Sequence, residues 1–221
     1  MNFDEYGLDI EEDDFIGMSP ETKKKLSIFK KPNLVLVVDG EELHIDKQEL
    51  IEKSPVFDTM LKSNFREKES EKIELPGKKI KDFVRFLRCT LSGTEDEINA
   101  SNALIIIPLA HEYQVETVLK KGDLVLADSC TKRGLKELSS KSIIDGLVFA
   151  EKYGLTNYLE SLINLASKKV FDYFSRAKGY SNLSQEVLFR IAMARWKNNI
   201  NPENGEPVKL PSKSYRNPTT T

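Results

Sequence analysis

A β-branched run followed at once by a tight-turn dipeptide is the feature that most restricts how this chain can fold. Leu34-Val-Leu-Val-Val38 favours extended backbone because β-branched side chains fit a pleated strand. Asp39-Gly40 comes next and can supply the positive φ angles of a two-residue hairpin turn. Leu43 and Ile45 then lie two residues apart, as on one face of a second strand. The segment therefore predicts an antiparallel hairpin.

Two helices, the second starting at Ser54-Pro55, and a third strand are predicted after the hairpin. Ser54-Pro55 is typical of a helix start, since serine caps free amides and proline suits the first helical position. Ile73 and Leu75 then alternate as a short strand that Pro76-Gly77 stops. The apolar residues of the second predicted helix fall on one face: Val56, Phe57, Met60 and Leu61.

Helical spacing of apolar residues dominates the rest of the chain. Pro108 is expected to kink or break one of these helices, because it cannot donate a hydrogen bond to the carbonyl of Leu104. Ser184 is expected to cap the last helix. The predicted helices cover residues 80–91, 102–113, 115–125, 143–150, 158–174 and 185–197.

Composition describes an ordinary globular chain. Its 221 residues, 39% hydrophobic and 31% charged, suffice for one medium domain or two small ones. Lys plus Arg number 33 against 35 Asp plus Glu, so the net charge of -2 gives no general reason to expect binding to nucleic acid or membrane. The apolar runs are shorter than the roughly 20 residues that span a bilayer, and the first residues lack a secretory pattern, so we expect a cytoplasmic or nuclear protein.

Charge and polarity divide the chain into four parts. Seven carboxylates and no basic residue lie in residues 1–14, which predicts a disordered acidic arm over 1–18. A domain with a short N-terminal helix is predicted over 19–129. After a polar stretch, an all-α region is predicted over 138–197, and 198–221 is expected to be a flexible tail.

The sequence holds few residues in arrangements that could support catalysis or bind a metal ion. His44 and His111 lack a nearby carboxylate or cysteine constellation in the sequence, and Cys89 and Cys130 lack zinc-site spacing. Gly-rich phosphate loops and hydrolase motifs are also missing from the sequence. We therefore expect a non-catalytic protein without cofactor or metal site.

The order of these elements resembles that of the BTB (POZ) family. Residues 34–57 resemble the family opening, in which a strand and turn lead to a helix and then to Ser-x-x-Phe, and residues 60–75 resemble its next block. Two positions depart from the family pattern: Asp46 stands where many members have histidine, and Asn33 replaces an aspartate. The resemblance implies an α+β fold with a small three-stranded sheet and a helical cluster.

Residues 138–197 resemble the three-box or BACK helical extension that follows BTB domains in ubiquitin-ligase adaptors. The amino-acid sequence as a whole is most similar to BTB proteins of the kind joined to MATH domains. The sequence shows no MATH domain, kelch repeats or zinc fingers, the modules that usually choose a substrate. The resemblance thus implies a substrate-recruiting adaptor of a third-type cullin ligase, whose substrate stays unidentified.

The same resemblance implies two contact sites. Phe65-Arg66-Glu67 matches a hydrophobic-x-Glu element that binds the third cullin in family members, with Phe65 as an anchor and Glu67 as an acceptor. Asn64, Tyr113 and Gln114 are the further expected cullin contacts. The alternative is that Phe65 folds back onto the core and Glu67 is solvated.

Dimerisation is also implied. Leu26, Ile28 and Phe29 occupy the place of the family's dimer-forming helix, and a symmetric dimer contact would bury them. The alternative is that they pack on their own domain. Two other functions stay open. The chain could be an oligomerising scaffold in transcriptional or cytoskeletal assembly, or a fragment that dimerises with full-length MATH-BTB relatives.

Overall fold

The computed structural model describes residues 33–63, 72–91 and 96–198. These residues form two compact units, which are treated separately below. The first comprises the described residues up to Ser129 together with Tyr153–Tyr158. The second comprises Cys130–Lys152 and the described residues from Leu159 onward.

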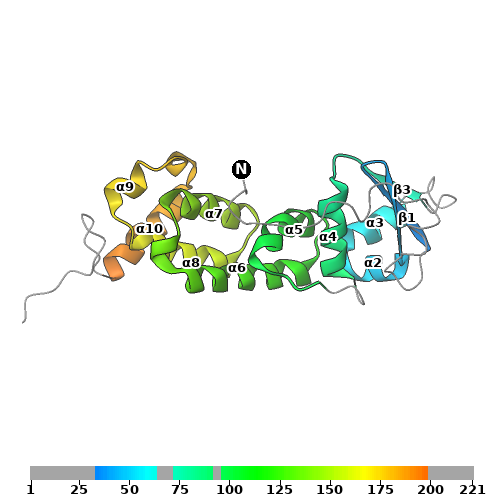
Figure 1. Ribbon diagram of the computed structural model, residues 1–221, viewed down its shortest axis with the longest axis horizontal. Helices are drawn as coiled ribbons and strands as arrows, with labels where there is room; N and C mark the ends of the chain where they lie inside the picture. The colour runs from blue at the N-terminus through cyan, green and yellow to red at the C-terminus, as the bar shows by residue number, and fades with distance from the viewer. Residues whose placement is uncertain (1–32, 64–71, 92–95, 199–221) are drawn as a thin grey trace, which may run out of the picture. The chain divides into compact units, whose positions relative to one another are not determined.

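Figure 1 labels the elements along the chain. The first unit contains β1 (Leu34–Val38), β2 (Glu41–Ile45), α2 (Lys47–Lys53), α3 (Pro55–Ser63), β3 (Lys72–Leu75), α4 (Ile80–Thr90), α5 (Ala100–Glu112) and the start of α6 (Glu116–Glu137). The second contains the end of α6, α7 (Ser140–Lys152), most of α8 (Thr156–Ser167), α9 (Phe171–Ser175), the short 3-10 helix η2 (Tyr180–Asn182) and α10 (Gln185–Lys197).

The sheet of the first unit has the strand order β2-β1-β3. Strands β1 and β2 are antiparallel, and the turn between them has positive φ at both Asp39 (54°) and Gly40 (79°), so the predicted hairpin is confirmed. Strand β3 pairs with β1 in parallel, with Val38 opposite Leu75. The small mixed sheet with helices that the sequence predicted is therefore present.

Both departures from the family pattern have local roles at the start of α2. The Asp46 carboxylate accepts hydrogen bonds from the backbone amides of Gln48 (2.9 Å) and Glu49 (3.3 Å), so it caps the helix. The Asn33 side-chain oxygen accepts from the amide of Lys47 at 2.7 Å. Together they satisfy three of the amides that a helix N-terminus leaves without a partner inside the helix.

Helices α2 and α3 lie beside the sheet (Figure 1). The inward residues of β1 alternate with partly exposed ones, as a strand with one buried face requires. Helix α4 contributes a strongly amphipathic face with Phe83, Phe86 and Leu87 fully buried. The largest fully buried side chains of this core are Phe57, Phe83, Phe86, Leu36, Ile45, Leu50, Leu87, Leu91 and Ile106.

Helix α5 continues through Pro108 to Glu112, so the break expected there is absent. Its start is fixed by a capping box, in which Asn99 accepts from the amide of Asn102 at 3.0 Å and Asn102 accepts from that of Asn99 at 2.8 Å. Ile106 and Ile107 are fully buried around the proline. This apolar packing offsets the one hydrogen bond that Pro108 cannot make.

Helix α6 extends well beyond the 115–125 segment that the sequence predicted, and Gly134 inside it has non-helical backbone angles (φ 70°, ψ -175°). Near its start, Gly122 lies against α5. A Cβ atom at Gly122 would come within 2.9 Å of Ile107 Cδ1 and 3.0 Å of its Cγ1. The glycine thus permits a close approach of α5 and α6 that any side chain would disturb.

In the second unit, the single helix predicted over 158–174 is two helices, α8 and α9. The residues between them leave the helical path, and Val170 is extended (φ -58°, ψ 124°). The Lys169 ammonium donates to the Leu138 carbonyl at 2.6 Å, and desolvation lowers its pKa. The predicted cap of α10 is confirmed, since Ser184 Oγ accepts from the amide of Val187 at 3.1 Å.

Candidate functional site

Ser54 joins the start of α3 to the turn that follows α5. Its hydroxyl oxygen accepts a hydrogen bond from the amide of Phe57 at 3.2 Å, which caps α3. The same hydroxyl donates to the carbonyl of Tyr113 at 2.6 Å. Ser54 is fully buried, so both bonds lie away from water. The two segments are held at a fixed separation by one side chain.

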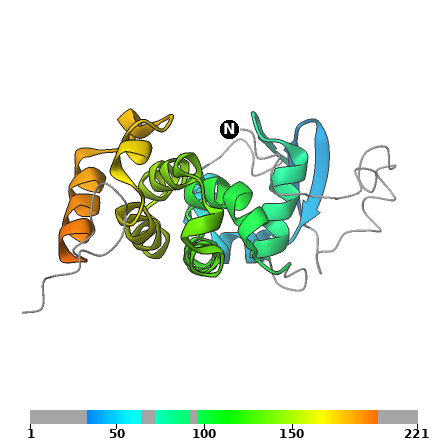
Figure 2. The same ribbon diagram turned by 60° about the vertical axis from the view of Figure 1, so that its left-hand side comes forward.

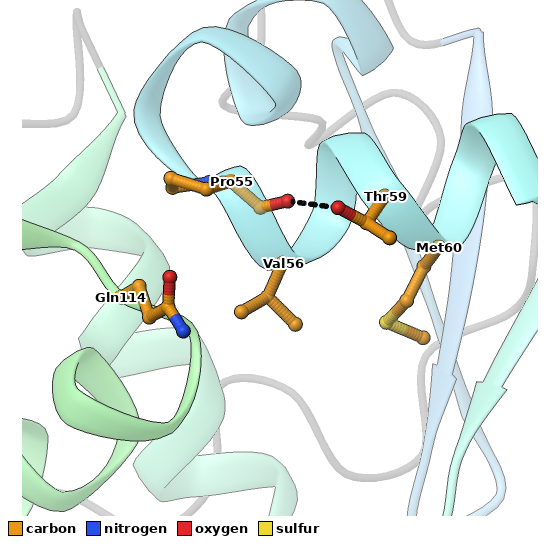
Figure 3. Close-up of a pocket in the computed structure, with 5 residues that line it drawn as sticks. All are labelled: Pro55, Val56, Thr59, Met60 and Gln114. Atoms are coloured by element: carbon orange, nitrogen blue, oxygen red, sulfur yellow. Dashed lines mark hydrogen bonds between the residues drawn. The ribbon is translucent and has the colours of Figure 1, made fainter.

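The turn after α5 has an uncommon backbone conformation at Gln114, whose φ is 54°. The amide of Val115 donates to the Ala110 carbonyl at 2.8 Å, so the chain reverses tightly there. Gln114 itself is exposed. In Figure 3 its side-chain amide lies across from Val56 of α3.

A groove of about 290 Å³ lies between α3 and this turn. Val56 and Met60, four residues apart on α3, give it an apolar wall, and both are partly buried against the core (Figure 3). The Thr59 hydroxyl donates to the Pro55 carbonyl at 2.9 Å. The five lining residues are Pro55, Val56, Thr59, Met60 and Gln114, and none of them is ionisable. Such a groove can accept apolar side chains and one or two hydrogen bonds, and it offers no acid, base or nucleophile.

Tyr113, one of the predicted contact residues, belongs to the core beneath this groove. Its side chain is 3% exposed, and its ring stacks on Phe57 with centroids 4.5 Å apart and an interplanar angle of 5°. It also meets the edge of Phe83 at 5.7 Å. Burial raises the pKa of the Tyr113 hydroxyl. Of the two predicted contact residues only Gln114 is exposed, and a cullin contact at Tyr113 stays a prediction.

The other predicted contact residues lie outside the described residues: Asn64, Phe65 and Glu67 of the proposed cullin site, and Leu26, Ile28 and Phe29 of the proposed dimer contact. Asn64 follows directly on Ser63, the last residue of α3. In the sequence, the hydrophobic-x-Glu element thus begins at the end of the helix that lines the groove.

Apart from Gln114, the sequence did not identify the groove-lining residues as a site. Val56 and Met60 were assigned with Phe57 to one inward face, whereas the structure buries Phe57 completely and leaves the other two partly exposed. Helical spacing alone could not have separated them, because Val56, Phe57, Met60 and Leu61 span about 140° of the helix, which one apolar face can accommodate.

Groups that could support catalysis are few in the described part of the chain. His44 lies 3.8 Å from a Glu42 oxygen at the surface, and the His111 ring meets the Tyr153 ring edge-on at 5.4 Å. Burial raises the pKa of the Cys89 and Cys130 thiols to about 11, which makes them weak nucleophiles at neutral pH. Across residues 33–63, 72–91 and 96–198, no group of three or more His, Cys, Asp or Glu side chains could hold a metal ion.

The helices show no span suited to a bilayer: within the described ranges, none is both long and apolar enough to cross one.

Comparison with known proteins gives a consistent match to the first unit. The model of the BTB/POZ domain matches residues 27–129. BTB and MATH domain-containing protein 36 of Caenorhabditis elegans is 32% identical over 125 residues, which are 56% of this chain and 36% of the relative. BTB and MATH domain-containing protein 38 of the same organism is 27% identical over 97 residues, 44% of this chain and 25% of the relative. The matches thus span only about a quarter to a third of these relatives.

Proposed function

Because residues 27–129 of this chain are a BTB/POZ domain, a protein-interaction module, we propose that the chain is a non-catalytic adaptor that docks a cullin of the third type through the groove between α3 and Gln114. The adaptor would bring a second protein to the ligase. The single observation that carries this proposal is an apolar, non-ionisable groove lined by α3, and in the sequence the hydrophobic-x-Glu element follows that helix.

The chemistry of the groove supports a helical partner. An amphipathic helix places apolar side chains at i, i+3 and i+4, which suits a wall built from Val56 and Met60. Gln114 can exchange hydrogen bonds with polar groups at the rim of such a helix. Phe65 would enter a pocket of the partner, and Glu67 would accept a hydrogen bond from it.

Pre-organisation supports tight binding at this place. The Ser54 hydroxyl bonds the start of α3 to the turn after α5, and the rings of Phe57 and Tyr113, the sequence neighbours of the lining residues Val56 and Gln114, are stacked in the core. A partner would therefore not have to order these segments on binding, which spares association an entropic cost.

Titration of the purified chain with the N-terminal domain of a third-type cullin tests the proposal. Met60→Glu should weaken binding by roughly 2 kcal/mol or about thirtyfold, because it places a charge on the apolar wall. Phe65→Ala combined with Glu67→Lys should weaken it by a similar factor. Leu124→Glu is the matched control, since Leu124 is 58% exposed on α6 and does not line the groove.

Circular dichroism melts of each variant separate lost binding from lost folding. Cullin affinity that survives both the Met60 variant and the double variant would overturn the proposal. An intact chain that self-associates without binding cullin would favour the oligomerising scaffold instead. In our proposal the adaptor is a dimer through Leu26, Ile28 and Phe29, and Ile28→Asp should reduce the sedimenting mass by half.

A further inference from the structure

Helix α10 has apolar residues on two opposite faces. Val187 (1% exposed) and Ile191 (5%) face the core of the second unit. Phe189 (61% exposed), Met193 (52%) and Trp196 (83%) follow one another at i, i+4 and i+7, so they share the outer side of the helix. We call these three residues the outer face of α10. Large apolar side chains gathered in one exposed stripe mark an interaction surface more often than isolated ones do.

The helix that carries this face is held in place at three positions. Ser184 caps its start and also donates to a Glu151 carboxylate oxygen. Arg190, in its middle, pairs with Glu160. Near its end, Arg195 Nη2 donates to the carbonyl oxygens of Ala166 and Lys169. In both views α10 lies at one end of its unit (Figures 1 and 2). The face is therefore presented on a rigid element.

The segment that carries the outer face is basic, although Glu151 and Glu160 of other helices also contact α10. Residues 168–198, which build α9, η2 and α10, hold seven basic residues and only two acidic ones. Asp172 pairs with Arg176, which leaves Glu186 as the other carboxylate of this segment. The basic residues are Lys168, Lys169, Arg176, Lys178, Arg190, Arg195 and Lys197. A partner that lands on the outer face would meet a positive potential.

Arg195 is a cation without a carboxylate partner among the described residues. Its Nε and Nη1 atoms are buried and have no hydrogen-bond acceptor there, and its Nη2 reaches only carbonyl oxygens. Its guanidinium carbon lies 5.8 Å from the centre of the Phe171 ring, which is itself 46% exposed. Desolvation lowers the pKa of Arg195. An anion close to α10 would compensate this charge.

We propose that the outer face of α10 binds an acidic peptide segment with interspersed apolar side chains, contributed by the protein that the adaptor recruits. The apolar side chains would pack on Phe189, Met193 and Trp196, and the carboxylates would lie toward the basic residues around them. This role rests on the proposed adaptor function. A second copy of the same face is a poorer occupant, because an isologous contact would bring two basic segments together.

The test uses the full chain and a fluorescein-labelled peptide that alternates Glu with Leu and Phe. Two comparison peptides replace either the apolar residues by Ser or the Glu residues by Lys. Fluorescence anisotropy gives the affinity, and Trp196, the only tryptophan of the chain, reports contact with the face through its emission. We expect the first peptide alone to bind and to shift the Trp196 emission to shorter wavelength. High salt should weaken this binding.

Phe189→Ser combined with Met193→Ser should weaken binding of the first peptide at least about tenfold. Leu124→Ser is the control, because Leu124 is an exposed leucine of similar size in the first unit, and it should leave the affinity unchanged. Lys197→Glu should weaken binding less than the apolar double variant. Each variant is checked by its melting temperature before its affinity is compared.

Four results would overturn the proposal. The first is no binding of the Glu/Leu/Phe peptide, and the second is equal binding of the peptide in which Ser replaces the apolar residues. The third is peptide binding that appears only after residues 1–14 of the chain are deleted, and the fourth is a Phe189/Met193 variant that loses self-association but still binds the peptide. The third result would assign the face to the acidic segment of this chain, and the fourth to a second copy. Cullin affinity of the same variants is measured in parallel. If the chain binds the peptide through this face but does not bind cullin, the binding surface on α10 is supported and the adaptor function is rejected.

Discussion

The hydroxyl of Ser54 donates a hydrogen bond of 2.6 Å to the carbonyl of Tyr113, a residue 59 positions later in the chain. This bond joins the first residues of α3 to the turn after α5 and so defines the width of the groove between them. Since Ser54 also caps α3, one small side chain serves both the stability of a helix and the shape of the candidate site.

Ser54→Ala should lower the free energy of unfolding by about 1–3 kcal/mol, because it removes a cap and leaves a buried carbonyl without its donor. Urea unfolding followed by circular dichroism measures the loss. Thr59→Ala is the control: Thr59 is exposed and its hydroxyl bonds within α3, so its removal should cost less than about 0.5 kcal/mol. Equal stability of the Ser54 variant and the unsubstituted chain would contradict this account.

Gly122→Ala should destabilise the chain. Alanine favours a helix over glycine by about 1 kcal/mol, but the added methyl group would overpack against Ile107 at a cost of about 1–3 kcal/mol. Ile107→Val removes Cδ1, the nearest atom, and alone should cost about 0.5–1.5 kcal/mol. Combined, the two changes should cost less than their sum, which a double-mutant cycle in urea detects. Strict additivity would show that the two residues do not press on each other.

Asp123 is a buried acceptor for the start of α8. Its carboxylate accepts from the amide of Asn157 (3.0 Å), from the Asn157 side chain (2.8 Å) and from the amide of Tyr158 (2.7 Å). Asp123→Ala should therefore lower the free energy of unfolding by about 1–3 kcal/mol. Asp128→Ala, an exposed carboxylate of the same helix, should change it by less than about 0.5 kcal/mol. A loss of the same size in both variants would assign the effect to net charge.

The two thiols should react slowly in the folded chain. Burial raises the pKa of Cys89 and Cys130 from 9.0 to about 11, and Asp96 adds to the shift at Cys89. At pH 8 a thiol with a pKa of about 11 is about one part in a thousand thiolate, against about one in ten for a thiol with a pKa of 9.0. Ellman's reagent should therefore label the native chain at least about a hundredfold more slowly than the denatured chain. Rapid native labelling of either thiol would contradict its burial.

The same shifts predict a loss of stability in alkali. Between pH 9 and about 11 the unfolded thiols release protons that the folded thiols retain, so the free energy of unfolding falls as the pH rises. At higher pH the raised pKa of the buried Tyr113 hydroxyl lowers the free energy of unfolding further. The lowered pKa of Lys169 has the opposite effect on stability. A Cys89→Ala, Cys130→Ala chain isolates the thiols, and its stability should decline less over this interval.

Local sequence predicted the elements whose causes are local. The hairpin follows from β-branched residues and Asp39-Gly40, and the starts of α3 and α10 follow from Ser54 and Ser184. Each of these depends on residues a few positions apart. The parallel pairing of β3 with β1 was not predicted from this pattern, because alternation alone does not choose a neighbour.

The errors arose where tertiary packing decides. At Pro108 the sequence left a kink or a break open, and the structure shows α5 continuous through it, with fully buried residues beside the proline. The predicted helix over 158–174 is divided where the Lys169 ammonium reaches the Leu138 carbonyl, 31 residues earlier in the chain. The groove is likewise a property of two distant segments, so only Gln114 of its lining residues was identified beforehand.

The parallel pairing of β1 with β3 also sets an order of events on the ribosome. Val35 pairs with Lys72, 37 positions later, whereas its hairpin partner His44 emerges almost at once. At a synthesis rate of about 5–20 residues per second, one edge of β1 stays unpaired for roughly two to seven seconds until β3 has been made. During that interval the nascent chain carries an open edge of valine and leucine that can pair with another chain. Synthesis is thus a stage at which the unpaired edge of β1 is open to aggregation.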